Sequence, residues 1–143
     1  MRTLAEVTDV LKRALNSGPI RRLPRKQADA EVLLALSVVH LSADAFYAEA
    51  EINLHLSQWL AVIAASDGAA DYITLRRRLV DLGFLRRADD GAIYRLVPER
   101  IDRVLAAQAR TIDPDQVFIE LEKERGERKA NVDHSASAGL DPL

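Results

Sequence analysis

Apolar residues recur every three or four positions in several stretches of the chain, the spacing that places them on one face of a helix. Four such stretches predict helices over residues 4–15, 27–41, 48–64 and 72–82. Thr3 and Glu6 have the capping-box spacing that favours the start of the first helix. The second stretch is apolar on most sides, which predicts a helix at the centre of the core.

The periodicity changes after Gly83, the residue type that commonly ends a helix. Residues 84–87 and 93–96 are short β-prone runs on either side of an Asp-Gly turn, which predicts a tight hairpin. Pro98 and Pro114 each favour the start of a further helix. The apolar face of the last helix stops at Leu121.

These elements predict a mostly α protein with a small β-hairpin. The order helix, short strand, helix, turn, helix, hairpin is that of a winged helix-turn-helix core, here with extra N- and C-terminal helices. The predicted division is an N-terminal helix at 1–18, a basic connector at 19–26, a winged-helix domain at 27–97, C-terminal helices at 98–129 and a disordered tail at 130–143. The tail is predicted to be disordered because it has little to bury.

The composition excludes several classes of function. A chain of 143 residues without Cys has no disulfide framework, thiol nucleophile or Cys-ligated metal. Because we find neither a signal-peptide core nor an apolar run of membrane-spanning length, we expect a cytoplasmic protein without a membrane partner. Gly-rich phosphate loops and paired catalytic carboxylates are also missing, which predicts a protein that is not an enzyme and has no cofactor or metal. Glu51 and His55 share a helical face, as metal ligands sometimes do. Without a second pair of ligands nearby, His55 is more commonly an ordinary surface residue than a metal ligand.

Charge is segregated along the chain although the net charge is only -2. Residues 19–26 contain four basic residues and no acid, whereas residues 27–75 contain seven acids and neither Lys nor Arg. Residues 76–110 contain nine Arg against five acids, and residues 111–143 contain four bases against eight acids. These blocks predict one basic surface, formed around the centre of the chain, on an otherwise acidic body.

The same region carries a set of residues that resembles a known family. The set is Tyr47-x-Glu49-x-Glu51-Ile52-Asn53, Asp71, Leu75-Arg76-Arg77-x-Leu79-Val80-Asp81-x-Gly83, an Arg at 86 or 87, and Gly91 before Tyr94. Over about residues 23–96 it resembles the bacterial domain-of-unknown-function family 2087. The resemblance implies a small winged-helix-like domain, found alone or beside transcription-regulator domains, and it implies no activity.

The charged helix and the hairpin therefore predict a DNA-binding protein, a candidate transcriptional regulator. On a helical wheel with Leu75 and Leu79 inward, Arg77 points outward and Arg76 lies on a flank. Arg can bridge the two major-groove acceptors of guanine. The leading predicted contacts are Arg76 and Arg77, with Thr74 secondary, and the predicted phosphate contacts of the wing are Arg86, Arg87 and Arg95. Strand alternation places Arg86 and Arg87 on opposite faces, and Arg21, Arg22, Arg25 and Lys26 extend the footprint.

Other interpretations of the same charges remain open. Arg77 and Asp81 have the spacing of a surface ion pair, and several Arg have acidic candidates for partners within residues 27–75. The fold would also serve as a protein-interaction module that docks an acidic partner without binding DNA. The apolar stripes of the terminal helices predict a homodimer, unless these helices wrap their own domain. A small-molecule effector is not identified by any residue set.

Overall fold

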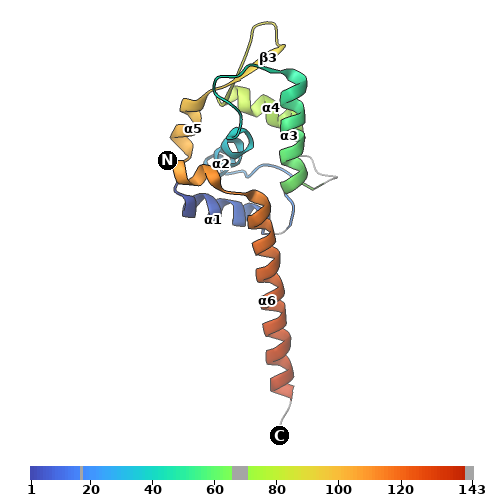
Figure 1. Ribbon diagram of the computed structural model, residues 1–143. Helices are drawn as coiled ribbons and strands as arrows, with labels where there is room; N and C mark the ends of the chain where they lie inside the picture. The colour runs from blue at the N-terminus through green and yellow to red at the C-terminus, as the bar shows by residue number, and fades with distance from the viewer. Residues whose placement is uncertain (17, 66–70, 141–143) are drawn as a thin grey trace.

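A computed structural model describes residues 1–16, 18–65 and 71–140 (Figure 1). In chain order the elements are α1 (Leu4–Leu15), α2 (Gln27–Val38), β1 (Tyr47–Ala48), α3 (Glu49–Ile63), α4 (Tyr72–Asp81), β2 (Leu85–Arg87), β3 (Ile93–Leu96), α5 (Pro98–Val104), the 3-10 helix η1 (Ala107–Thr111) and α6 (Pro114–Leu140). The predicted mostly α class with a small hairpin is confirmed, and the four helices of the N-terminal half lie where the periodicity placed them.

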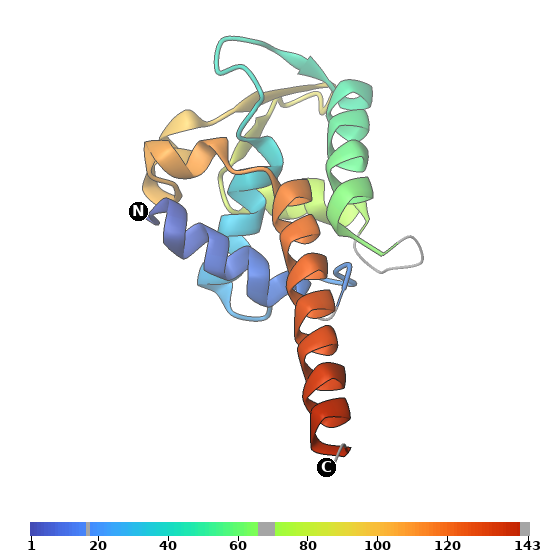
Figure 2. The same cartoon turned by 60° about the horizontal axis from the view of Figure 1, so that its bottom comes forward.

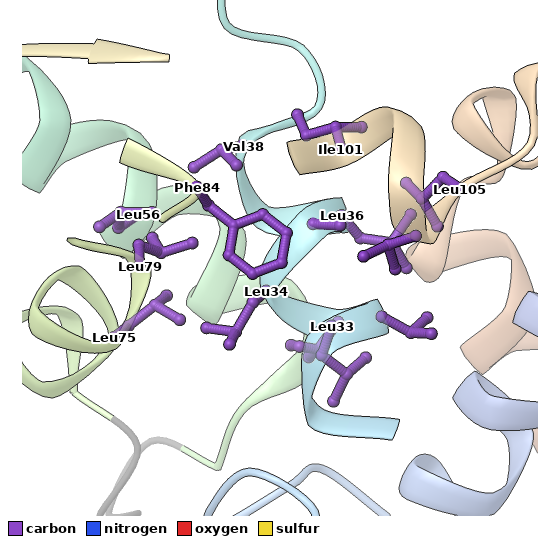
Figure 3. Packing of buried hydrophobic residues seen from close by; sticks show 14 of the residues in the cluster. Leu33, Leu34, Leu36, Val38, Leu56, Leu75, Leu79, Phe84, Ile101 and Leu105 are labelled. Carbon is purple, nitrogen blue, oxygen red and sulfur yellow. The ribbon is translucent and has the colours of Figure 1, made fainter. Parts of the chain in front are cut away.

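Helix α2 is the centre of the core, as its wide apolar face predicts. Every residue from Val32 to Val38 is buried, and the side chains of α3, α4 and α5 surround them (Figure 3). The one polar member, Ser37, donates its hydroxyl to the carbonyl of Leu34 at 2.7 Å. A helical segment with no polar face is stable only when neighbours cover all its sides, as they do for residues 32–38.

The hairpin is part of a three-stranded antiparallel sheet with strand order β1-β3-β2. Gly91 in the turn has a φ of 75° and Gly83 after α4 has a φ of 84°, left-handed values that favour glycine. One sheet face carries Leu85, Tyr94 and Leu96, which are buried against the helices. The other face points to solvent, so the sheet covers only one side of the core.

The terminal helices are buried against their own domain. Val7, Leu11 and Leu15 of α1 are at most 1% exposed, and α1 lies beside the start of α6 (Figure 2). Helix α5 packs against α2 through Ile101. The apolar stripes on which the homodimer prediction rested are thus covered within one chain, and that argument for a dimer no longer applies.

Helix α6 extends well beyond the body of the protein (Figure 1). Val117 and Leu121 are buried, and the apolar face ends at Leu121 as predicted. The backbone nevertheless remains helical to Leu140, whereas the composition predicted disorder from residue 130. Residues 122–129 are rich in Glu, Lys and Arg, which have high helix propensity, so this part of α6 has a local reason to be helical that residues 130–140 lack.

The capping box at the start of α1 forms as predicted. Glu6 accepts from the backbone N–H and the hydroxyl of Thr3, and the Thr3 hydroxyl oxygen accepts from the Glu6 N–H at 3.2 Å. The backbone bond from Thr3 and then its hydroxyl lower the pKa of Glu6 below the ordinary 4.5. These bonds therefore stabilise α1 fully above the ordinary value and are lost as the pH falls through the lowered pKa.

We expect an NMR titration to find Glu6 ionising below 4.5, and Thr3→Ala to move its pKa part of the way back, because only the hydroxyl bond is removed. An unchanged pKa in Thr3→Ala would assign the whole effect to the backbone bond.

Candidate nucleic-acid interface

Helix α4 is fixed at its start by a cap and along its length by two buried leucines. Asp71 accepts from the Thr74 N–H at 2.7 Å, the N-cap bond expected of this residue type. Leu75 and Leu79 are 3% and 0% exposed, respectively, and α4 packs against α3. The opposite side of the helix is exposed at Ile73, Arg77 and Asp81. The predicted inward stripe and outward face are confirmed.

Arg76 does not lie on that outward face. Its side chain is only 15% exposed and forms an ion pair with Glu49 of α3 at 3.0 Å. The same guanidinium donates to Asn53 Oδ1 at 2.5 Å and lies 5.9 Å from the centre of the Tyr94 ring. The helical wheel placed Arg76 on a flank, and α3 occupies that flank. Nη1 of Arg76 is therefore engaged by Glu49 and Asn53 and the side chain is mostly buried, which leaves Arg76 less accessible to DNA than a leading contact would be.

Arg77 is exposed and has no ion pair or hydrogen bond with any residue that the structure describes. The ion pair considered with Asp81, one turn later, is not formed within 4 Å. An unpaired guanidinium in water retains its full donor capacity for a ligand. Arg77 is therefore the residue of α4 best placed for an external anion.

The arginines of the hairpin divide between the two faces of the sheet. Arg86 lies directly opposite Arg95 in the antiparallel register, and both point to the solvent face. Arg87 lies opposite Tyr94 on the other face, toward α4. The predicted alternation of Arg86 and Arg87 is confirmed, and it separates the three wing arginines into two groups.

Arg87 and Arg77 line the same cleft between the hairpin and α4. This cleft has a volume of about 230 Å³, and its walls are Arg76, Arg77, Val80, Asp81, Arg87 and Tyr94. The Arg87 guanidinium extends over Gly91. A Cβ added at Gly91 would lie 2.9 Å from the Cζ atom of Arg87. A side chain at Gly91 would displace this guanidinium, so the glycine serves both the turn and the position of Arg87.

Arg86 and Arg95 line a different hollow of about 390 Å³, together with Asp44 and Glu99. Arg95 also lies 5.4 Å from the centre of the exposed Phe46 ring, within cation–π range. Two like charges directly opposite each other on a sheet are unfavourable unless an anion is near. The tip between the strands carries Asp89 and Asp90, both exposed, so the hairpin is not uniformly basic.

Thr74 and the basic connector lie on the other flank of α4. The Thr74 hydroxyl donates to Asp71 Oδ2 at 3.2 Å, so its predicted role as a secondary DNA contact competes with the cap. Thr74 and Arg78 line a cavity with Arg22 of the connector. Arg22 and the other three basic residues of the connector, Arg21, Arg25 and Lys26, are exposed. No local pattern predicts that Arg22 and Arg78 line the same cavity, since 55 intervening residues separate them.

The two residues considered as metal ligands have local roles instead. The Glu51 carboxylate accepts from the Ala48 N–H at 2.9 Å, and His55 Nε2 lies 2.9 Å from the Ser37 carbonyl oxygen. The part of the chain that the structure describes contains no cluster of three or more His, Cys, Asp or Glu suited to a metal ion.

Comparison with known families matches residues 19–96, more than half of the chain, to the family described as an uncharacterized protein conserved in bacteria, DUF2087. The chain belongs to this family. The match begins at residue 19 rather than 23, so it includes the basic connector as well as the segment from α2 to β3. Comparisons with curated proteins and with solved structures gave no match. In the described residues, no helix is long and apolar enough to cross a membrane.

Proposed function

We propose that this DUF2087 member is a cytoplasmic winged helix-turn-helix protein that binds duplex DNA and acts as a transcriptional regulator. The observation that carries the proposal is the cleft shared by Arg77 and Arg87, two cations from separate elements. Neither forms an ion pair with a described residue, although the carboxylate of Asp81 also lines the cleft. The element order from α2 to β3 and the strand order β1-β3-β2 are consistent with this fold.

The length of α4 and its exposed Arg77 support this proposal. Helix α4 has 10 residues, its buried side is held by α3, and Arg77 extends from the side that remains open. A major groove admits one α-helix, and Arg supplies contacts to guanine or phosphate there. In this arrangement Arg87 would contact a phosphate beside the groove, and Arg76 would hold α4 against α3 without touching DNA.

The experiment is a salt titration of binding to a random-sequence DNA duplex, followed by fluorescence anisotropy. Affinity should fall steadily with salt, because each neutralised phosphate releases counterions. We expect the Arg77→Ala, Arg87→Ala double variant to weaken binding at least about tenfold at low salt and to reduce the salt slope by about 2.

The Arg86→Ala, Arg95→Ala double variant is the matched control, since it changes the charge by the same amount on the opposite face of the hairpin. It should retain most of the affinity. The reverse ranking of the two double variants would move the DNA site to the outer face. An absence of binding by the unmodified protein at low salt would reject DNA binding altogether.

A protein-interaction module is the second candidate, and the outer face of the sheet favours it. Phe46 and Ile93 are 67% and 41% exposed beside Arg95. Arg and aromatic residues are enriched in protein interfaces, and an acidic partner would relieve the repulsion between Arg86 and Arg95. If the unmodified protein does not bind DNA, this surface is the one to test with acidic peptides.

A further inference from the structure

A small cavity lies on the flank of α4 opposite the proposed DNA cleft. It has a volume of about 200 Å³. Leucines from the connector, α3 and α4 form its apolar lining, and polar side chains complete it. The leucines are Leu23, Leu60 and Leu75, and the polar residues are Arg22, Asp71, Thr74 and Arg78.

The polar groups of this cavity are not electrically balanced. Two guanidinium groups line it against one carboxylate, that of Asp71, whose two oxygens accept from the N–H and hydroxyl of Thr74. Arg22 and Arg78 form no hydrogen bond or ion pair with the residues described. Arg78 is nevertheless half-buried, and a half-buried guanidinium favours an anionic partner.

We propose that this cavity binds a small organic monocarboxylate. Its apolar body would contact Leu23, Leu60 and Leu75, and its carboxylate would accept hydrogen bonds from Arg22 and Arg78. A cavity of about 150 Å³ can hold a benzene ring, so about 200 Å³ suits a body of that size with one carboxylate. The two guanidinium groups select the charge, because they are donors that cannot accept a hydrogen bond.

A ligand in this cavity would contact α4 directly. Thr74 and Arg78 line the cavity, whereas Arg77 lines the cleft on the opposite flank of the same helix. A ligand that contacts Arg22 and Arg78 would tie the connector to α4. This binding site does not depend on the proposed DNA function, and an effect on DNA affinity would be a separate result.

The probe is benzoate, and its neutral comparison is benzamide, which has nearly the same shape. Isotope-labelled protein is titrated with each and followed by NMR at the methyl groups of Leu23, Leu60 and Leu75. We expect benzoate to bind with saturation and at least about tenfold more tightly than benzamide, because only the carboxylate forms charge-assisted bonds to both arginines.

Arg22→Gln and Arg78→Gln are the test variants, and Arg103→Gln, at an exposed arginine of α5, is the matched control. Each test variant should lose most of the preference for benzoate over benzamide, and the control should keep it. Circular dichroism checks that each variant folds. Equal binding of the two probes by the unmodified protein, or no saturable shift of these methyl groups, would overturn the proposal without bearing on DNA binding.

Discussion

Phe84→Ala is expected to lower the free energy of unfolding by about 3–5 kcal/mol, the range for a large buried aromatic residue. Phe84 is 0% exposed and lies at the junction of α4 and β2, with its ring beside Leu34 of α2 (Figure 3). Alanine would leave a cavity where α2, α4 and the sheet meet. The change would also remove the ring that lies 4.4 Å from the Arg100 guanidinium.

Arg100 adds polar contacts next to the Phe84 ring. Its Nε donates to the Leu82 carbonyl at 2.9 Å, and its Nη2 pairs with Glu31 at 3.0 Å. Helix α5 is thereby joined to the end of α4 and to α2 above the Phe84 ring. Loss of the ring would loosen this junction in addition to creating a cavity.

Urea unfolding followed by circular dichroism measures the effect, and Phe46→Ala is the matched control. Phe46 is the same residue type but is 67% exposed, so its removal should change the free energy of unfolding by no more than about 1 kcal/mol. Equal effects of the two substitutions would contradict the placement of Phe84 at the centre of the core.

Arg76→Ala is expected to lower the free energy of unfolding by about 1–3 kcal/mol. The substitution leaves the Glu49 carboxylate and the Asn53 side-chain oxygen without their donor, and an unpaired polar group costs about this much. Glu49 remains 43% exposed, so water replaces part of the lost interaction and the effect stays below that of a fully buried pair.

Arg77→Ala, one residue along the same helix, should change the free energy of unfolding by no more than about 0.5 kcal/mol, because Arg77 is exposed and unpaired among the described residues. A double-mutant cycle of Arg76→Ala with Glu49→Ala measures the coupling directly. If Arg76→Ala and Arg77→Ala gave the same stability, or the cycle showed no coupling, the structural role assigned to Arg76 would be wrong.

These two neighbouring arginines show how the structure changes the interpretation of the basic segment. A charge count treats Arg76, Arg77 and Arg78 as one cluster, whereas in the fold each has its own surroundings. Arg76 holds α4 to α3, Arg77 faces the cleft with Arg87, and Arg78 faces the small cavity. The proposed DNA contact and the proposed ligand contact therefore use opposite flanks of one helix, and they can be tested by separate substitutions.

The local elements of this protein follow from its sequence. Thr3 with Glu6, Asp71, Gly83 and the Asp-Gly turn act through contacts within a few residues, so their effect does not depend on the rest of the chain. The apolar periodicity likewise predicted which side of α4 is buried, because the period of a helix is fixed by its backbone geometry.

Only the tertiary structure decided which charges are free. Glu49 is 27 positions from Arg76 and Arg22 is 56 positions from Arg78, so no local rule relates the members of either pair. The terminal helices also bury their apolar stripes against the same chain. Periodicity could not predict this, because an apolar stripe indicates that a helix face is covered but does not indicate which segment covers it. Ion pairing and domain packing depend on contacts between distant segments, and those exist only once the chain has folded.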